Sequence, residues 1–139
     1  MNSATIPPAV TEFYRDALRA RPGGDPAAVL ERLLADDFRS RNSQEVKDKA
    51  TLQRQFAGLW KMMPDLKFEP QEMLAAGDRV IVRSVASGSP SGPFMGVETD
   101  GSRSFRIDTI DIHRVVDGRI AEVFHVEDWM SALRQLSGR

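Results

Sequence analysis

The spacing of apolar residues changes halfway along the chain, and this change limits the folds that the chain can adopt. In the first half, apolar residues recur every three or four positions, as on one face of an amphipathic helix. Three such stripes are present, running from Val10 to Leu18, from Val29 to Leu34 after Asp25-Pro26, and from Leu52 to Met63. The ends of these stripes are marked by capping residues, Gly and Pro, so we expect three helices before residue 65.

The second half has the period of two that is typical of strands whose side chains alternate between two faces. Strands are predicted over residues 66–74, 79–86, 104–116 and 119–127. Residues 88–101 are rich in Gly and Pro, which predicts a long loop without a regular element. Asp128 is predicted to cap a short final helix. Helices that precede an antiparallel sheet indicate an α+β fold, in one domain over residues 1–139.

Composition excludes several classes of function. The 139 residues carry 19 Lys and Arg against 20 Asp and Glu, so no positive field attracts nucleic acid or an anionic membrane. The chain has no Cys, which removes thiol nucleophiles and thiolate metal sites. Its apolar runs are far shorter than the roughly 20 residues of a membrane span. We expect a cytoplasmic protein with neither nucleic acid nor a membrane as a partner.

Several short motifs together resemble the SnoaL-like polyketide or ester cyclases of the nuclear-transport-factor-two-like superfamily. They are MPDL at 63–66, AAGDRVIVR at 75–83, GPFMG at 92–96, DGRIAEVFHVEDW at 117–129 and LRQL at 133–136. The resemblance covers nearly the whole chain. It implies a cone-shaped, curved antiparallel sheet with N-terminal helices enclosing a pocket, an α+β barrel of cystatin-like topology.

The resemblance also implies an activity and its residues. Cyclases of this family close a ring by an intramolecular aldol reaction and use no metal or cofactor. Their general base is a carboxylate that follows an aromatic residue on the last strand, where this chain has His125. A polar partner, often histidine, lies on the preceding strand, near Asp111 here, and Arg41 stands where a pocket-facing histidine is common. His125, Asp111 and Arg41 are therefore the predicted catalytic residues.

Whether Asp111 and His125 share a face depends on the turn at Asp117-Gly118. In a two-residue type I′ turn, Val116 pairs with Arg119 and Asp111 faces Phe124, which puts His125 on the other face. In a three-residue loop with a left-handed Gly118, Val115 pairs with Arg119 and Thr109 faces His125, so that Asp111 and His125 lie together. The residues alone favour neither register. The resemblance favours the three-residue loop.

On a shared face, the two residues have the chemistry of proton transfer α to a carbonyl. A neutral imidazole is a competent base near neutral pH, and a carboxylate on its other nitrogen would fix its tautomer. Arg41 or Arg83 would stabilise the enolate, while the other predicted substrate contacts are Asn42, Trp60, Met63, Phe94, Thr109 and Asp128. Simpler explanations compete: a buried neutral His125, a structural ion pair for Asp111, core packing for Trp60 and Met63, and a helix cap for Asp128. His113 is expected at the surface.

Three functions remain open. The first is a cyclase or isomerase that acts on a small hydrophobic carbonyl compound. The second is a non-catalytic protein that binds a small ligand or serves as a dimeric scaffold. The third is an epoxide hydrolase, which needs two acids and an amide around one water, whereas Asp111 supplies one acid. In each case the apolar residues on the opposite sheet face predict a homodimer through the sheet: Ile110, Ile112, Ile120, Phe124 and Val126.

Overall fold

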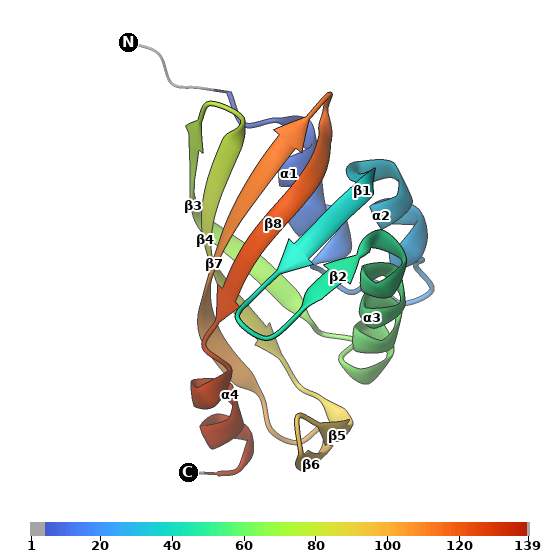
Figure 1. Cartoon of the computed structure of the whole chain (residues 1–139). Coiled ribbons are helices and arrows are strands. Elements are labelled where there is room, and N and C mark those ends of the chain that lie inside the picture. Colours follow the sequence, from blue (N-terminus) through green and yellow to red (C-terminus); the bar gives the residue numbers. More distant parts are fainter. Residues whose placement is uncertain (1–4, 139) are drawn as a thin grey trace.

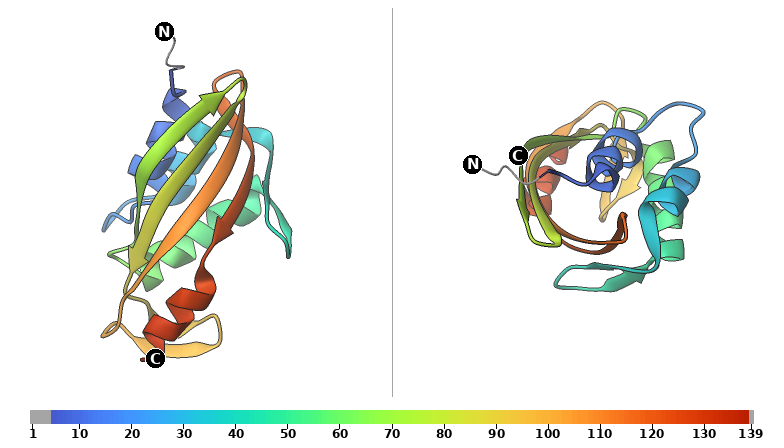
Figure 2. Two further views of the ribbon diagram at one scale, coloured as in Figure 1. Left: turned by 90° about the vertical axis from the view of Figure 1, so that its left-hand side faces the viewer. Right: turned by 90° about the horizontal axis from the view of Figure 1, so that it is seen from above.

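A curved sheet with helices on its concave side forms the body of the molecule (Figures 1 and 2). The computed structural model describes residues 5–138, so residues 1–4 and 139 of the predicted domain lie outside the described residues. Its elements are α1 (Pro8–Glu12), η1 (Phe13–Ala17), α2 (Pro26–Leu33), β1 (Leu34–Arg41), β2 (Val46–Asp48), α3 (Lys49–Met62), β3 (Lys67–Ala76), β4 (Arg79–Gly88), β5 (Ser91–Phe94), β6 (Val97–Asp100), β7 (Phe105–Val116), β8 (Arg119–Glu127) and α4 (Trp129–Leu136).

The predicted helices are present, and their ends have the expected causes. The Asp25 carboxylate accepts the backbone N–H groups of Ala27 and Ala28, and Pro26 occupies the first turn of α2. Asp128 caps α4 in the same way, by accepting from the backbone of Ser131. The first stripe is divided: α1 passes into η1, a π-helical turn in which the Leu18 N–H donates to the Phe13 carbonyl at 2.9 Å.

Six strands form the main sheet, in the order β2-β1-β8-β7-β4-β3. All neighbouring pairs are antiparallel except β1 and β8, which run parallel. The sequence did not predict β1 and β2, because β1 follows α2 without a break and opens with Leu34, which continues the helical stripe. No helix in the described part of the chain is long and apolar enough to cross a membrane.

The prediction of an irregular loop over residues 88–101 is wrong. This stretch contains β5 and β6, which pair as a small hairpin beside α4 at the lower end of the sheet (Figure 1). The hairpin turns at Met95 and Gly96, whose φ angles of 49° and 83° are those of a type I′ turn. Gly and Pro were taken as signs of an irregular loop. Here Gly96 supplies the turn of a hairpin, and Pro93 lies on an edge strand of a two-stranded sheet.

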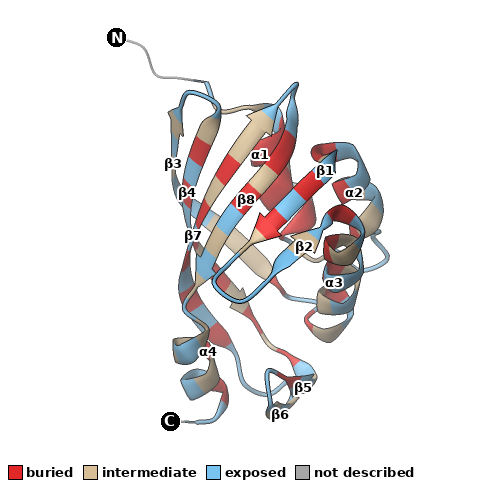
Figure 3. Ribbon diagram, in the orientation of Figure 1, coloured by how far each residue is buried: buried red, intermediate tan, exposed pale blue. Residues whose placement is uncertain are grey.

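Burial alternates along the central strands β4 and β7, as Figure 3 shows. The inward residues of β7 are buried, and they are Phe105, Ile107, Thr109, Asp111 and His113. They face α1, η1 and α3 across the inside of the cone, where the apolar core lies in two clusters. Three of these five inward residues of β7 are polar, so the lining of the cone changes from apolar to polar along one strand.

The β7–β8 hairpin has a register that neither alternative described. Its turn has two residues: Val116 pairs with Arg119, and Asp117 and Gly118 have φ angles of 51° and 78°. The favoured three-residue loop is therefore wrong. One step further, however, β8 contains an extra residue, since Arg114 pairs with Glu122 and Val115 with Ile120. This bulge at Ala121 shifts the remaining pairs by one position and brings His125 directly opposite Asp111.

The bulge also corrects the prediction for Ile120. Ile120 and Ala121 are both buried, because the extra residue interrupts the alternation of faces. Ile120 thus belongs to the core and not to the outer face of the sheet.

Candidate active site in the cone

A pocket with a volume of about 90 Å³ opens inside the cone between the sheet, η1 and α3. Most of its wall is apolar, with aromatic rings contributed by Phe13, Phe56, Phe68 and Trp129. The ionisable side chains that reach it come from one patch of sheet, namely Asp111 on β7 and His125 and Glu127 on β8. The described lining residues include no Lys or Arg. The pocket is therefore an apolar space with one acid and base patch on its wall.

Asp111 is held from behind by a tyrosine and a second histidine. The Tyr14 hydroxyl donates to Oδ2 of Asp111 at 2.6 Å, and the same hydroxyl lies 2.6 Å from Nε2 of His113. All three residues are buried, and His113 has no exposed surface. The prediction that His113 lies at the surface is wrong. The bulge in β8 and the packing of Phe13 against its ring enclose it.

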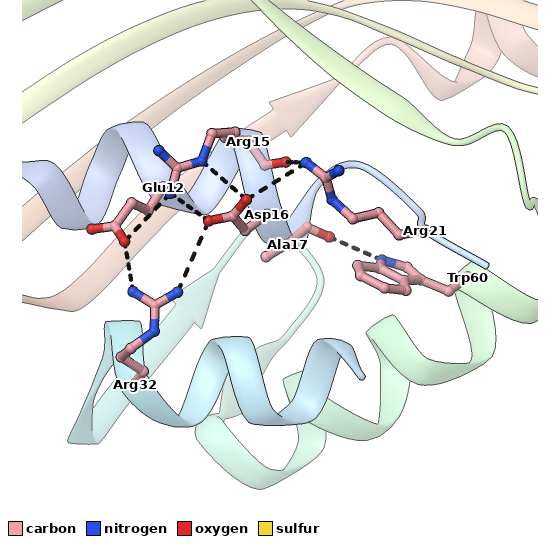
Figure 4. Close-up of polar contacts among 7 residues, drawn as sticks. All are labelled: Glu12, Arg15, Asp16, Ala17, Arg21, Arg32 and Trp60. Carbon is pink, nitrogen blue, oxygen red and sulfur yellow. Dashed lines mark hydrogen bonds and ion pairs between the residues drawn. The ribbon is translucent and has the colours of Figure 1, made fainter. Parts of the chain in front are cut away.

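Tyr14 reaches Asp111 because η1 is fixed from the outside. Arg32 on α2 contacts Glu12 at 2.6 Å and Asp16 at 3.9 Å, and Asp16 also pairs with Arg15 and Arg21 (Figure 4). These ion pairs are largely exposed, so each contributes little by itself. On the inner side, the indole Nε1 of Trp60 donates to the Ala17 carbonyl at 2.9 Å (Figure 4). Together these contacts fix the single π-helical turn that carries Tyr14.

His125 has its own carboxylate partner, which is Glu127. The Nδ1 atom of His125 lies 2.8 and 3.0 Å from the two carboxylate oxygens of Glu127. The indole Nε1 of Trp129 also donates to Glu127, at 3.3 Å. Because Glu127 engages Nδ1, the other ring nitrogen, Nε2, remains for a molecule in the pocket. The expected orienting carboxylate was Asp111, which instead lies opposite His125 as a separate group.

The environment raises the pKa values of both Asp111 and His125. Burial raises the pKa of Asp111 to about 7, and the Glu127 charge adds to this, while the Tyr14 hydrogen bond and the His125 charge oppose it. Burial alone would lower the pKa of His125, but the hydrogen bond and charge of Glu127, with the charge of Asp111, raise it. Burial keeps His113 neutral by lowering its pKa to about 3. Groups that titrate near neutral pH are suited to proton transfer there.

Several predicted site residues lie away from the pocket. Arg41 projects from the opposite side of β1 to Ser40, which lines the pocket, and its Nε donates to Glu122 at 2.6 Å. Arg83 lies on the outer face of β4 and pairs with Glu72 at 2.7 Å. The side chain of Asn42 accepts the backbone N–H groups of Gln44 and Glu45 in a surface turn. None of these three residues lines the pocket.

The remaining predicted contacts are divided between wall and core. Met63 lines the pocket. Trp60 supports η1, and Phe94 stacks on Phe105 beside Trp129 in the neighbouring apolar cluster. Thr109 is buried on the same face of β7 as Asp111, two residues before it. Asp128 caps α4 and is exposed.

Sequence reasoning missed two residues of the site. Glu127 lies two positions after His125, so strand alternation places it on the same face, and this spacing could have identified it. Tyr14 had no such signal, because it occupied an apolar helical stripe and its hydroxyl meets β7 only in the folded chain. Among the described residues, no three His, Asp or Glu side chains are grouped as metal ligands.

Comparisons with known proteins agree with this architecture. The family model for the SnoaL-like polyketide cyclases matches residues 9–136, and the chain therefore belongs to this family. No curated protein matches the chain at a significant level.

Solved structures share the fold. A protein from Jannaschia sp. CCS1, assigned as a SnoaL-like polyketide cyclase, is 21% identical, with a TM-score of 0.81 over 94% of this chain and 90% of that one. IdmH from Streptomyces antibioticus, assigned to the polyketide cyclases, is 26% identical, with a TM-score of 0.77 over 93% and 96%. A Catenulispora acidiphila protein with a ketosteroid isomerase-like fold, solved with trimethylamine, is 18% identical, with a TM-score of 0.76 over 96% and 95%.

Proposed function

We propose that the protein catalyses proton transfer at the carbon next to a carbonyl group, in a cyclisation of the aldol type or an isomerisation of a small hydrophobic molecule. The observation that carries this proposal is the position of Asp111 and His125, which are opposite one another in the β7–β8 register and both line a mostly apolar pocket. A carboxyl whose pKa is raised to about 7 and an imidazole whose pKa is raised above its usual value form the pair of groups that an enolisation needs.

The contacts favour one assignment of roles. His125 is held by Glu127, which favours the imidazolium, so His125 is the better proton donor to the carbonyl oxygen. Asp111 in its ionised form is then the base that removes the α proton. This exchanges the roles predicted from the sequence, where His125 was the base. The reason is the Glu127 carboxylate, which raises the pKa of the imidazole beyond that of an isolated histidine.

The pocket wall indicates the kind of substrate. Asp111 and Glu127 oppose a bound anion, and Lys and Arg are missing from the described lining. A volume of about 90 Å³ is small beside the roughly 300–1,000 Å³ of pockets for drug-sized ligands. We therefore propose that a neutral ring or short chain bearing the ketone enters the pocket, while a larger substrate extends from its mouth.

Solvent-deuterium uptake at the α carbon tests this proposal. We expect the protein to accelerate exchange in neutral aryl ketones such as 1-indanone, and to act at least about 10-fold less efficiently on the same ring carrying a carboxylate, because of charge repulsion. Exchange is followed by mass spectrometry, with kcat/KM as the measure. Binding of 1-indanone without exchange would support the non-catalytic function instead. Preference for the anionic ketone would contradict the proposed pocket electrostatics.

One observation also favours epoxide hydrolysis as a second candidate. Asp111, Glu127 and the amide of Gln55 all line the pocket, so two acids and an amide are present where the sequence indicated one acid. It ranks second because Glu127 is engaged by His125 and Trp129. Hydrolysis of indene oxide in the absence of ketone exchange would place this function first.

The outer face of the sheet supports a proposed homodimer. Leu74, Ile81, Ile112 and Phe124 are paired in register across β3, β4, β7 and β8, and they form one apolar row on the convex side. Ile110 and Val126 pair in the adjacent row and are exposed. Arg and Glu side chains of both signs flank these rows, which suits a second copy of the same face related by a two-fold axis.

Phe124→Glu should separate such a dimer. A carboxylate buried at the centre of the interface has no partner, so we expect the dissociation constant to rise at least about 100-fold. Light scattering coupled to size exclusion should then give the monomer mass of 15.5 kDa in place of twice that value. Val116→Glu is the control, because Val116 is exposed at the hairpin end of β7 outside the two rows. A wild-type chain that is monomeric at high concentration would rule out this interface.

A further inference from the structure

Behind the pocket, a chain of hydrogen bonds runs from His113 through Tyr14 to Asp111. Both links measure 2.6 Å, and the three side chains are buried. Only Asp111 belongs to the pocket wall. His113 and Tyr14 therefore do not meet a bound substrate, and any effect they have on the reaction passes through the Asp111 carboxyl.

Donor and acceptor counting fixes the direction of this chain. The Tyr14 hydroxyl has one proton, and an ionised Asp111 can only accept, so that proton must point to Asp111. Nε2 of His113 must then carry a proton and donate it to the Tyr14 oxygen. In the reverse direction, a protonated Asp111 donates to Tyr14, which donates to Nε2, and the imidazole proton moves to Nδ1.

The two directions differ in what they leave unpaired. Nδ1 of His113 is buried and has no hydrogen-bond partner among the described residues. In the reverse direction this atom is an unpaired buried N–H donor, whereas in the forward direction it is a bare acceptor, and buried donors without partners are the rarer case in proteins. The surroundings of His113 thus disfavour the direction that goes with a protonated Asp111.

We propose that His113 and Tyr14 are positioning residues for the proposed reaction: His113, as the Nε2–H tautomer, directs the Tyr14 proton to Asp111, which favours the ionised form of the carboxyl and orients it toward the pocket. The inference rests on the proposed function in one respect only, namely that the reaction uses the Asp111 carboxylate as its base. Other groups that face Asp111 are His125 and Glu127 from β8, while β4 presents the uncharged Val82. Phe13 packs edge-to-face against the His113 ring.

Nuclear magnetic resonance of the full chain tests the inference without a substrate. The ring ¹⁵N shifts of His113 should show a neutral Nε2–H tautomer throughout the neutral pH range. The ¹³C titration of the Asp111 carboxyl should move up by about one pKa unit in Tyr14→Phe, because one hydrogen bond to the charged form is lost. His113→Leu should raise it by a smaller amount, and should have no effect when Tyr14→Phe is already present.

His113→Gln is the matched variant, since its amide can still donate to Tyr14, and it should keep the wild-type titration of Asp111. A protonated Nδ1 in the wild-type protein, or a His113→Leu effect that persists in Tyr14→Phe, would overturn the proposed chain. Thermal unfolding of each variant identifies any that fail to fold. Ketone exchange, measured separately, distinguishes the two proposals. If the hydrogen bonds run from His113 to Asp111 but no exchange occurs, only the proposed function is refuted. If exchange occurs but the hydrogen bonds run in the reverse direction, only this inference is refuted.

Discussion

Replacing Asp111 with Asn is expected to reduce α-proton exchange by about 100- to 10,000-fold and, at the same time, to make the protein more stable at pH 8. Activity falls because the amide cannot accept the proton. Stability rises because a buried carboxyl whose pKa is about 7, instead of 3.8, is costly to ionise in the folded state. At 1.36 kcal/mol per pKa unit, the gain in the free energy of unfolding is at most about 4 kcal/mol. Tyr14 can still donate to the Asn oxygen.

The pH dependence makes this prediction specific. Between pH 3.8 and about 7, the folded wild-type protein binds more protons at Asp111 than the unfolded chain does, so this group destabilises the protein progressively as the pH rises. Urea unfolding should therefore show the full advantage of Asp111→Asn at pH 8 and almost none near pH 4. A variant that is less stable than wild type at pH 8 would show that Asp111 serves as a structural ion pair and not as a buried base.

Replacing His125, or removing the negative charge of Glu127, should impair the proposed protonation of the carbonyl oxygen. His125→Ala is expected to lower kcat/KM for exchange by about 100-fold or more, because the carbonyl oxygen loses its proton donor. Glu127→Gln keeps an acceptor for Nδ1 but loses the negative charge, so the pKa of His125 should fall. Since the imidazolium is the proposed active form, the alkaline limb of the pH–rate profile should move to lower pH in Glu127→Gln.

Glu122→Gln is the control for this experiment. Glu122 is a second carboxylate on β8, but it pairs with Arg41 and Arg114 away from the pocket. Its replacement, and that of Arg41 by Ala, should change exchange less than about twofold. A Glu127→Gln profile that keeps the wild-type alkaline limb, or an equal shift in Glu122→Gln, would show that His125 is not tuned by Glu127.

The periodicity of the sequence was sufficient for the fold class and for most elements. Apolar spacing predicted three N-terminal helical stripes and four of the strands, and the quoted motifs identified the SnoaL-like family that the family model confirms. These features are local, and the residues of a stripe or an alternating run reveal them directly. The strands β1, β2, β5 and β6 were missed because their pairing partners, and not their composition, make them strands.

The candidate site followed from the sequence only in part. His125 and Asp111 could be named because an acid and an imidazole stand at informative positions on strands. Arg41 was placed near them by the family resemblance and Arg83 by its position on a strand, but alternation and the pairing with Glu122 and Glu72 put both on the outer face. Neighbouring residues of a strand point to opposite faces of the sheet, so a charged residue can be close to a site in sequence and still lie on the other face.

By itself, the sequence determined the helical and strand periods, the family, and the presence of an acid and an imidazole on successive strands. Only the tertiary structure decided that the two groups share one face of the sheet, because one extra residue at Ala121 compensates for the two-residue turn and reverses the face of every residue after it. It also decided that Tyr14 supports Asp111 from 97 positions away. Register and long-range contacts depend on the energy of the whole packed cone, and no short window of residues contains that information.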